Sequence, residues 1–187
     1  MELQMKLAVG CDVAGYDFKC GLIDSLRQRG YRVTDVGCNS CHEGIYPYYA
    51  ERVAKEVLSG RCERGILICG TEQGMMMAAN KIPGIRAALC TEIFTAIMSR
   101  EHNNSNVLCL GAWVLEDVQR ALPIVEAWLF GKYSGRHDDK LALLEKLSRG
   151  ETLEDEEAVS YTHLLSGRRR SMRLWAWPPT CACCTMW

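Results

Sequence analysis

The stretch "RGILICGTEQGMMMAANK", residues 64–81, decides the fold because a strand, a tight turn and a helix follow one another directly. An unbroken apolar run that ends at a glycine is typical of a strand buried on both faces of a sheet. Gly70, Thr71 and Gly74 form the expected turn, and the three methionines after it are expected to pack in the core. This succession is the unit from which parallel α/β sheets are built.

The same alternation of short apolar runs and longer amphipathic runs continues on both sides of this stretch, from Lys6 to about Ser148. The expected strands are 6–10, 31–37, 64–70, 85–90 and 106–111, and the expected helices are 18–30, 46–60, 74–81, 91–103, 115–133 and 138–148. Five strand–helix alternations predict a doubly wound, five-stranded parallel sheet with helices on both faces, an α/β/α sandwich.

Ligands of such sheets bind at the carboxyl ends of the strands. Three of the expected strand ends carry small or polar residues: "GCD" at 10–12, "ICGT" at 68–71 and "CLG" at 109–111. We therefore expect these three segments to converge on one crevice.

The composition is that of one globular domain with an extension: 187 residues, 48% of them hydrophobic and 24% charged. The net charge of −1 gives no reason to expect a nucleic-acid partner or an anionic membrane surface. The sequence has no secretory signal pattern and no run of about 18 apolar residues that could span a bilayer. The expected location is the cytoplasm.

The chain changes character after Gly150, so we predict a domain over 1–150 and a tail over 151–187. The tail has an acidic run, a basic run and an ending rich in Trp, Pro and Cys, without periodicity. We expect it to be disordered. Its cysteines lack the histidines or the second spaced pair of a zinc site.

The eleven cysteines do not predict a disulfide scaffold, because most are scattered through expected strands and helices and the total is odd. We expect most of them to be small buried side chains. "CNSCH", residues 38–42, matches a haem-attachment pattern, but no export signal accompanies it. A plain turn is favoured there, and a metal site or a redox pair of Cys38 and Cys41 is the alternative. No metal or cofactor is expected.

Cys69 is the first candidate for chemistry, because it ends a strand just before a turn that can direct several backbone N–H groups inward. Such a turn would bind an anion or a developing oxyanion and would lower the thiol pKa. The alternative is a buried cysteine before a tight turn.

His102, in "SREHNN" at 99–104, is a candidate general acid or base near neutral pH, and the alternative is a histidine that meets the dipole of a helix end. Arg136 and Lys140 are four residues apart and are expected on one face of a helix start. That spacing suits an anion clamp, although exposed basic pairs are usually only solvated.

Four motifs, in this order between about Lys6 and Leu147, resemble the ribose-5-phosphate isomerase B family, which includes the Lac-type galactose-6-phosphate isomerases. They are "KLAVGCDVAGYDFK", "ILICGTEQGMMMAANKIPGIRAAL", "SREHNNSNVLCLG" and "SGRH". The resemblance implies a Rossmann-like fold and a homodimer, or a tetramer made of two dimers. It also implies an enzyme of carbohydrate metabolism that interconverts aldose and ketose sugar phosphates, as in the pentose phosphate pathway, without a metal.

The resemblance also implies catalytic roles. The family's catalytic cysteine falls on Cys69, which would move a proton between C1 and C2 through an enediolate. The helper threonine falls on Thr71, and the anion hole falls on the amides between Gly70 and Gly74. His102 matches the ring-opening histidine, and in this family the site is shared across the dimer interface, so His102 and the Cys69 of one site would come from different subunits.

Further positions match residues that bind the substrate in the family. Asp12 falls beside the ring oxygen and hydroxyls, and Tyr46 and Asn103 fall at sugar contacts. Arg136 matches a phosphate ligand, and Lys140 stands where a second arginine is usual.

Departures from the family pattern are concentrated in the site. Val13 replaces a histidine and Trp113 replaces an arginine, both near the phosphate, while Ile45 stands where an aspartate is common. Glu72 replaces a glycine and is expected to raise the pKa of Cys69 if it points inward. These changes predict an isomerase whose preferred substrate is not ribose 5-phosphate. The alternative is a non-catalytic protein that keeps the fold and binds a sugar or sugar phosphate.

Overall fold

The computed structural model describes residues 5–42 and 44–153, which contain one five-stranded sheet. The strands are β1 (Lys6–Cys11), β2 (Arg32–Asp35), β3 (Arg64–Cys69), β4 (Ala87–Leu89) and β5 (Val107–Gly111). All neighbouring strands are parallel, in the order β2-β1-β3-β5-β4. The predicted parallel sheet is confirmed, with β4 as a short edge strand and β5 as the neighbour of β3.

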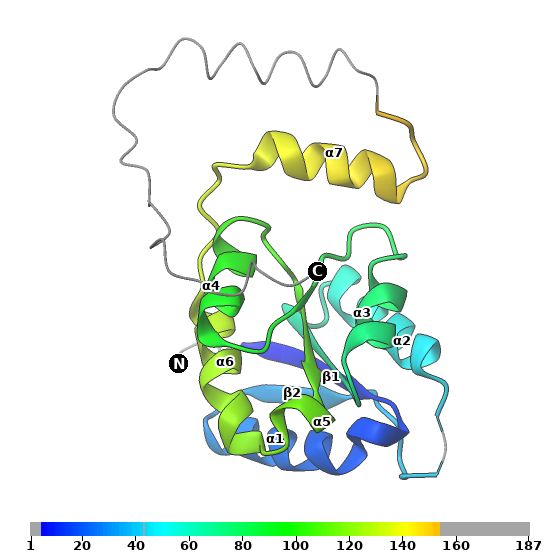
Figure 1. The fold of residues 1–187 in the computed structure, drawn as a ribbon, viewed down its shortest axis with the longest axis vertical. Helices are drawn as coiled ribbons and strands as arrows, with labels where there is room; N and C mark the ends of the chain where they lie inside the picture. The colour runs from blue at the N-terminus through cyan, green and yellow to red at the C-terminus, as the bar shows by residue number, and fades with distance from the viewer. Residues whose placement is uncertain (1–4, 43, 154–187) are drawn as a thin grey trace, which may run out of the picture. The chain divides into compact units, whose positions relative to one another are not determined.

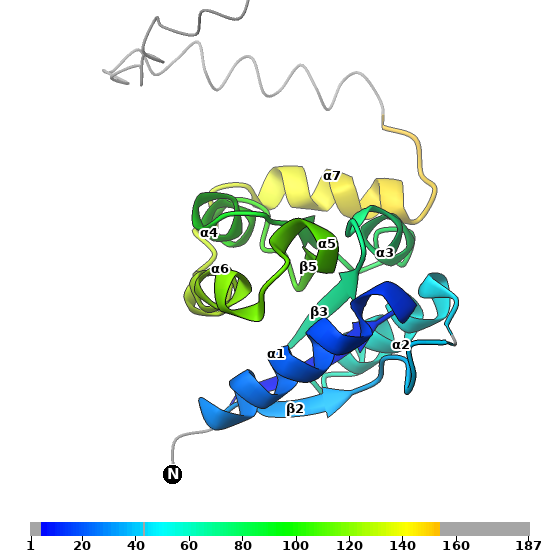
Figure 2. The same cartoon turned by 60° about the horizontal axis from the view of Figure 1, so that its bottom comes forward.

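Helices cover both faces of this sheet, as the predicted sandwich requires (Figure 1; Figure 2). They are η1 (Val13–Gly15), α1 (Tyr16–Gln28), α2 (Tyr46–Leu58), α3 (Gln73–Ala79), α4 (Ile93–Glu101), α5 (Ala112–Leu115), α6 (Val118–Phe130) and α7 (Asp138–Ser148). On one face, Leu22 of α1 and Trp128 of α6 belong to the same buried cluster as Ile66. On the other face, Val53 of α2 and Met75 of α3 pack with Leu67, so the expected core role of the first methionine is confirmed. The prediction is wrong for Met77, which is 58% exposed because it lies on the outer side of α3.

Local signals in the sequence set the ends of these helices. Gly30 and Gly60 follow α1 and α2 with φ of 89° and 73°, the left-handed conformation that glycine adopts at helix ends. Pro47 lies in the first turn of α2, where its missing N–H has no role in the helix. Asp117 caps α6, accepting a hydrogen bond from the N–H of Gln119 at 2.9 Å.

The register of the sheet brings the three expected strand ends together. Cys11 at the end of β1 pairs with Ile68, and Cys69 at the end of β3 pairs with Gly111 at the end of β5. The N–H of Asp12 donates to the carbonyl of Ile68 at 3.2 Å. β2 lies on one side of β1 and β3 lies on the other side, so the strand order reverses at the end of β1. Ligands of such sheets bind at this switch point.

α7 lies across the ends of α3 and α4 and buries none of its side chains (Figure 1; Figure 2). A cavity of about 570 Å³ lies beneath it, lined by Leu141 and Leu144 of α7 and by Arg86 and Asn103 among others. No helix among the described residues is long and apolar enough to cross a membrane. Most of the predicted tail, from residue 154 onward, lies outside the described residues.

Candidate active site

Cys69 lies where β1, β3 and β5 end side by side. Its side chain is 5% exposed and packs in the same cluster as Met75 and Cys109. The parallel register therefore fixes the position of the sulfur, because the strands on both sides of β3 hold it. A group held this rigidly suits a reaction that needs a defined distance to its substrate.

Opposing effects control the ionisation of Cys69. Burial is the largest effect and raises the thiol pKa, and the negative charge of Asp12 raises it further. The backbone N–H groups of Met75, Glu72 and Thr71 act in the opposite direction, because they stabilise a thiolate. The prediction of a lowered pKa is therefore wrong for the net shift, since burial outweighs the amides.

Two aromatic rings flank the turn that follows Cys69. A Cβ at Gly70 would lie 2.7 Å from the ring of Trp113, and one at Gly74 would lie 3.2 Å from the ring of Tyr46. The N–H of Trp113 also donates to the carbonyl of Gly70 at 3.0 Å. Trp113 is 67% exposed, so its ring rests on the turn and still faces solvent. Aromatic faces beside backbone donors are typical of small-molecule sites.

Asp12 lies directly after β1 and caps η1, accepting a hydrogen bond from the N–H of Gly15 at 3.2 Å. Partial burial raises its pKa, and the N–H groups of Gly15 and Ala14 oppose this shift. Its charge acts on Cys69, so the structure brings these two predicted residues together. We call Asp12, Cys69 and the turn 70–74 the strand-end cluster.

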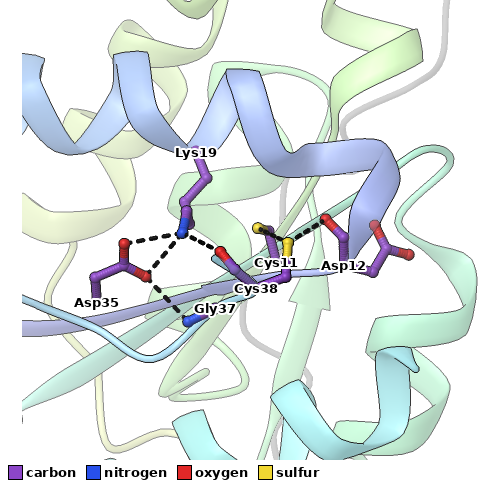
Figure 3. Close-up of polar contacts among 6 residues, drawn as sticks. All are labelled: Cys11, Asp12, Lys19, Asp35, Gly37 and Cys38. Carbon is purple, nitrogen blue, oxygen red and sulfur yellow. Dashed lines mark hydrogen bonds and ion pairs between the residues drawn. The ribbon is translucent and has the colours of Figure 1, made fainter. Parts of the chain in front are cut away.

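A buried lysine on α1 is linked to the strand-end cluster through Cys38 (Figure 3). Lys19 of α1 is 2% exposed and donates to both carboxylate oxygens of Asp35, at 2.8 and 3.1 Å, and to the carbonyl of Cys38 at 2.7 Å. The thiol of Cys38 then donates to the carbonyl of Asp12 at 3.2 Å. This network was not predicted, although a lysine among the apolar positions of an expected helix was a usable signal.

Cys38 does not form the redox pair that was considered for it. Its sulfur lies 3.3 Å from that of Cys11, and both side chains are buried. Cys41 is exposed, and its sulfur lies 3.5 Å from Nε2 of His42. The hypothesis of a Cys38–Cys41 pair is therefore wrong, because the chain turns Cys38 inward and Cys41 outward.

Glu72 occupies the turn in the left-handed conformation, with φ of 64°. Its side chain is 1% exposed and is directed at β5, where a Cβ on Gly111 would lie 2.8 Å from Oε1. Oε2 is buried without a hydrogen-bond partner, and burial raises the pKa of Glu72 to about 7. The carboxyl therefore points inward, as considered from the sequence, but toward β5 rather than toward Cys69.

A second group of predicted residues meets at the end of α4. Nη2 of Arg136 lies 2.8 Å from Nε2 of His102 and 3.5 Å from Oε1 of Glu101. Because a guanidinium can only donate, Nε2 of His102 accepts, and the neutral ring carries its proton on Nδ1. The arrangement joins a titratable ring to a cation at an exposed position.

His137 extends this second group, and it was not among the predicted site residues. Its ring lies 5.2 Å from that of His102, edge to face, and its Nδ1 is buried without a partner among the described residues. Partial burial lowers the pKa of His137, and the positive charges of Lys140 and Arg136 lower it further. Its place in the "SGRH" motif was the signal that could have found it.

We call His102, Arg136, His137 and Lys140 the helix-end cluster. The prediction that Arg136 and Lys140 share a helix face is wrong, because α7 begins at Asp138 and Arg136 precedes it. Asn103 is exposed and lines the cavity under α7.

The two clusters do not touch within one chain. Among residues 5–42 and 44–153, the side-chain contacts of His102 and Arg136 are with Glu101, His137 and each other, and none of them reaches Asp12, Cys69 or Thr71. In the same described part of the chain, no three His, Cys, Asp or Glu side chains are gathered as a metal ion requires.

Comparisons with known proteins identify relatives of this chain. Residues 7–144 match the family model described as Ribose/Galactose Isomerase. Ribose-5-phosphate isomerase B of Escherichia coli strain K12 is 41% identical over 145 residues, which cover 77% of this chain and 97% of that protein. D-erythrulose-4-phosphate isomerase of Pectobacterium atrosepticum is 40% identical, covering 70% of this chain and 86% of that protein.

The solved structures agree with this result. Ribose-5-phosphate isomerase B of Clostridium thermocellum has a TM-score of 0.75 and 44% identity, and the match covers 78% of this chain and 99% of that one. The similarity therefore extends over the whole sheet and both clusters.

Proposed function

Since the chain belongs to the ribose/galactose isomerase family and is an aldose–ketose isomerase of a sugar phosphate, we propose that Cys69 carries the proton between C1 and C2. The observation that supports this role most directly is the position of its sulfur, at a strand end beside Asp12 and three thiolate-stabilising amides. No other described cysteine ends a strand directly before such a turn and has three turn amides beside its sulfur.

The proposed reaction begins with an open-chain aldose. The Cys69 thiolate takes the proton from C2, and the electron pair of that C–H bond forms the C1–C2 double bond of an enediolate. The negative charge moves to the oxygen on C1, where the turn amides and the Thr71 hydroxyl stabilise it. The thiol returns its proton to C1, the proton of the C2 hydroxyl passes to the C1 oxygen, and a ketose results.

Asp12 would help to time this proton transfer. Its negative charge raises the pKa of Cys69 while the site is empty. A sugar hydroxyl that donates a hydrogen bond to Asp12 would disperse that charge, and thiolate formation would become easier when substrate is bound.

The helix-end cluster would hold the other end of the substrate. Arg136, His137 and Lys140 supply donors for a phosphate, and His102 accepts from Arg136 at the edge of this group. We assign ring opening to His102, since a neutral imidazole can both give and take a proton. Asn103 and Tyr46 would contact the sugar between the two ends.

We propose that the enzyme is a homodimer in which the helix-end cluster of one subunit completes the strand-end cluster of the other. The separation of the clusters within one chain supports this arrangement. Large apolar side chains on α4 and α7 support it too, because Phe94 is 66% exposed and Ile93, Leu144 and Leu147 are about half exposed.

We further propose a substrate other than ribose 5-phosphate and a cytoplasmic location. Val13 and Trp113 offer no charge to a phosphate, whereas the exposed rings of Trp113 and Tyr46 offer apolar faces to a sugar. A relative that acts on D-erythrulose 4-phosphate supports a search among shorter substrates. Eight described cysteines, all of them free, suit a reducing compartment.

A coupled assay on a panel of four-, five- and six-carbon sugar phosphates, with the free sugars beside them, tests this function. We expect turnover of at least one phosphorylated sugar, with exchange of the C2 proton in deuterated water. Binding without exchange would instead support a non-catalytic sugar-phosphate-binding protein. An active Cys69→Ala variant would remove the assigned role of the thiol.

A further inference from the structure

Glu72 is a buried acid for which the reaction above has no use. Its backbone belongs to the turn that follows Cys69, and its N–H is one of three that stabilise the Cys69 thiolate. Its side chain leaves the turn on the opposite side and is directed at the end of β5. The same residue therefore joins the catalytic turn to the protein interior.

The carboxyl of Glu72 has a space that only a glycine at position 111 leaves open. A Cβ on Gly111 would lie 2.8 Å from Oε1 and 2.9 Å from Cγ of Glu72. The side chain is 1% exposed, and its Oε2 has no hydrogen-bond partner. A buried carboxylate without a partner is strongly unfavourable, whereas a neutral carboxylic acid is tolerated far better.

In the described part of the chain, no side chain stabilises the negative charge of Glu72, and only the backbone of Gly111 favours it. The titratable side chains that face it are thiols: Cys109 on β5 and Cys90 after β4, and both have pKa values raised in part by the charge of Glu72. Cys69 lies at the start of the same turn. Among the described residues, no cation contributes to the pKa of Glu72. Burial, the largest effect, raises this pKa to about 7, and a hydrogen bond from the backbone of Gly111 acts in the opposite direction.

Ionisation of Glu72 would therefore disturb the turn. The carboxylate would have to draw in water or leave its space, and its backbone would move with it. That backbone also accepts the hydrogen bond from the N–H of Met76, at 3.1 Å, which closes the first turn of α3. Movement there would displace the amides of Thr71, Glu72 and Met75 from the Cys69 sulfur.

We propose that Glu72 is a positioning residue: its protonated carboxyl holds the turn 70–74 in the conformation that activates Cys69, and its ionisation ends that activation. This proposal rests on the proposed function of Cys69. It requires Cys69 to lose a proton while Glu72 keeps one, so the two ionisations have opposite effects on the rate. In most thiol-dependent reactions the rate continues to rise above neutral pH as the thiol ionises. In this enzyme the rate would instead stop rising once Glu72 ionises.

The test compares wild type with Glu72→Gln, which keeps the shape of the neutral acid and cannot ionise. We expect the ratio of kcat/KM at pH 8 to that at pH 6 to be about tenfold higher in Glu72→Gln, since with a pKa of about 7 the protonated fraction of Glu72 in wild type falls about tenfold between these two pH values. Glu116→Gln is the matched control, because Glu116 also has a left-handed backbone, with φ of 63°, but an exposed side chain. Its ratio should equal that of wild type.

Two readouts do not depend on a known substrate. Alkylation of Cys69 by iodoacetamide, followed by peptide mass, reports its thiolate against pH, and the exposed Cys20 in the same digest is an internal control. Difference infrared spectroscopy reports the carboxylic-acid band of Glu72, which should vanish near pH 7 in wild type and be missing in Glu72→Gln. If Glu72→Gln does not fold, Glu72→Gly replaces it, since glycine suits the left-handed backbone.

Superimposable pH profiles of wild type and Glu72→Gln, for both turnover and alkylation, would overturn the proposal. So would an infrared spectrum in which Glu72 is already ionised at pH 6. Failure to turn over any sugar phosphate would count against the proposed substrate instead, because alkylation and infrared spectroscopy still decide the role of Glu72.

Discussion

The strand-end cluster and the helix-end cluster differ in what holds their side chains. Cys69 is fixed by a parallel register on both sides, by burial and by backbone amides. His102 and Arg136 lie at a helix end and in the segment before α7, and their partners are other exposed charged side chains. One cluster is rigid before any ligand arrives, and the other depends on long side chains that water also solvates.

This difference assigns the two tasks of the enzyme to different parts of the fold. Proton transfer needs a defined distance, which the sheet provides. Phosphate recognition needs charge and tolerates some adjustment, which exposed basic side chains provide. If each cluster is completed by a second chain, the rigid part of one subunit meets the adjustable part of the other.

The largest expected effect concerns the need for both clusters at one site. Cys69→Ala and His102→Ala should each lower kcat by roughly a thousandfold, as loss of a general acid or base does. Co-expression of the two variants with different tags should restore activity to about a quarter of wild type in the mixed population, because half of the dimers would then hold one intact site.

Activity of the purified mixed dimer is the measurement, and each variant mixed with itself is the control. If activity is not restored, both clusters act within one chain, and the proposal that two subunits share each site is wrong.

The second effect concerns the strand-end cluster and its contribution to the free energy of unfolding. The unfolded chain releases the Glu72 proton near the ordinary value of 4.5, and the folded chain releases it at about 7. The unfolded state therefore binds fewer protons in between, so the free energy of unfolding should fall from pH 4.5 to 7 and stay level above. The loss should be about 3 kcal/mol, since each unit of pKa shift is about 1.4 kcal/mol.

Urea unfolding of wild type and Glu72→Gln across this pH range measures that loss as a difference between the two proteins. If the free energies of unfolding of the two proteins depend on pH in the same way, Glu72 has its ordinary pKa in the folded chain.

A third expected effect lies in the helix-end cluster. Arg136→Ala should raise KM for a phosphorylated substrate by about 10- to 100-fold with a smaller change in kcat, since a charge-assisted contact is worth about 1.5–3 kcal/mol. The KM of Arg136→Lys should lie between those of wild type and Arg136→Ala, because lysine keeps the charge and loses the planar fork of the guanidinium.

Arg149→Ala is the control, since Arg149 is an exposed arginine just after α7. Equal losses for phosphorylated and free sugars would show that Arg136 does not contact phosphate.

The smallest expected effect is at Trp113. Its ring is exposed, like the side chains of the helix-end cluster, but it rests on Gly70 of the strand-end cluster. Trp113→Ala should weaken substrate binding by about 2- to 10-fold, the range for one aromatic contact. Trp113→Phe should lose less affinity than Trp113→Ala, because it keeps an aromatic ring. Calorimetry on both variants checks this order, and equal affinity of Trp113→Ala and wild type would remove the ring from the binding site.

The parts of the molecule that depend on periodicity were predictable from the sequence. Strand and helix alternation gave the parallel sheet, and the sheet then required Asp12 and Cys69 to lie side by side. The edge position of β4 was not predictable, because nothing local distinguishes an edge strand of three residues from a central one. The helix over 138–148 was predicted with the bounds it has, but Arg136 was wrongly given a place on its face, since Arg136 precedes the first residue, Asp138.

Other features depend on contacts between distant parts of the chain. The sign of the Cys69 pKa shift required the balance between burial and amide donors, which no motif contains. The direction of the Glu72 side chain required its left-handed backbone and the missing side chain of Gly111. The contact between Cys11 and Cys38 joins the end of β1 to the segment after β2, which only the folded sheet brings together.

The space beside Gly111 also restricts how this sequence can change over time. With Glu72 in place, even a methyl group at position 111 would meet its carboxyl at 2.8 Å. A larger residue at position 111 would therefore require the Glu72 side chain to move. The two residues are 39 positions apart in the sequence, yet substitutions at them should not have additive effects, because their side chains share one space.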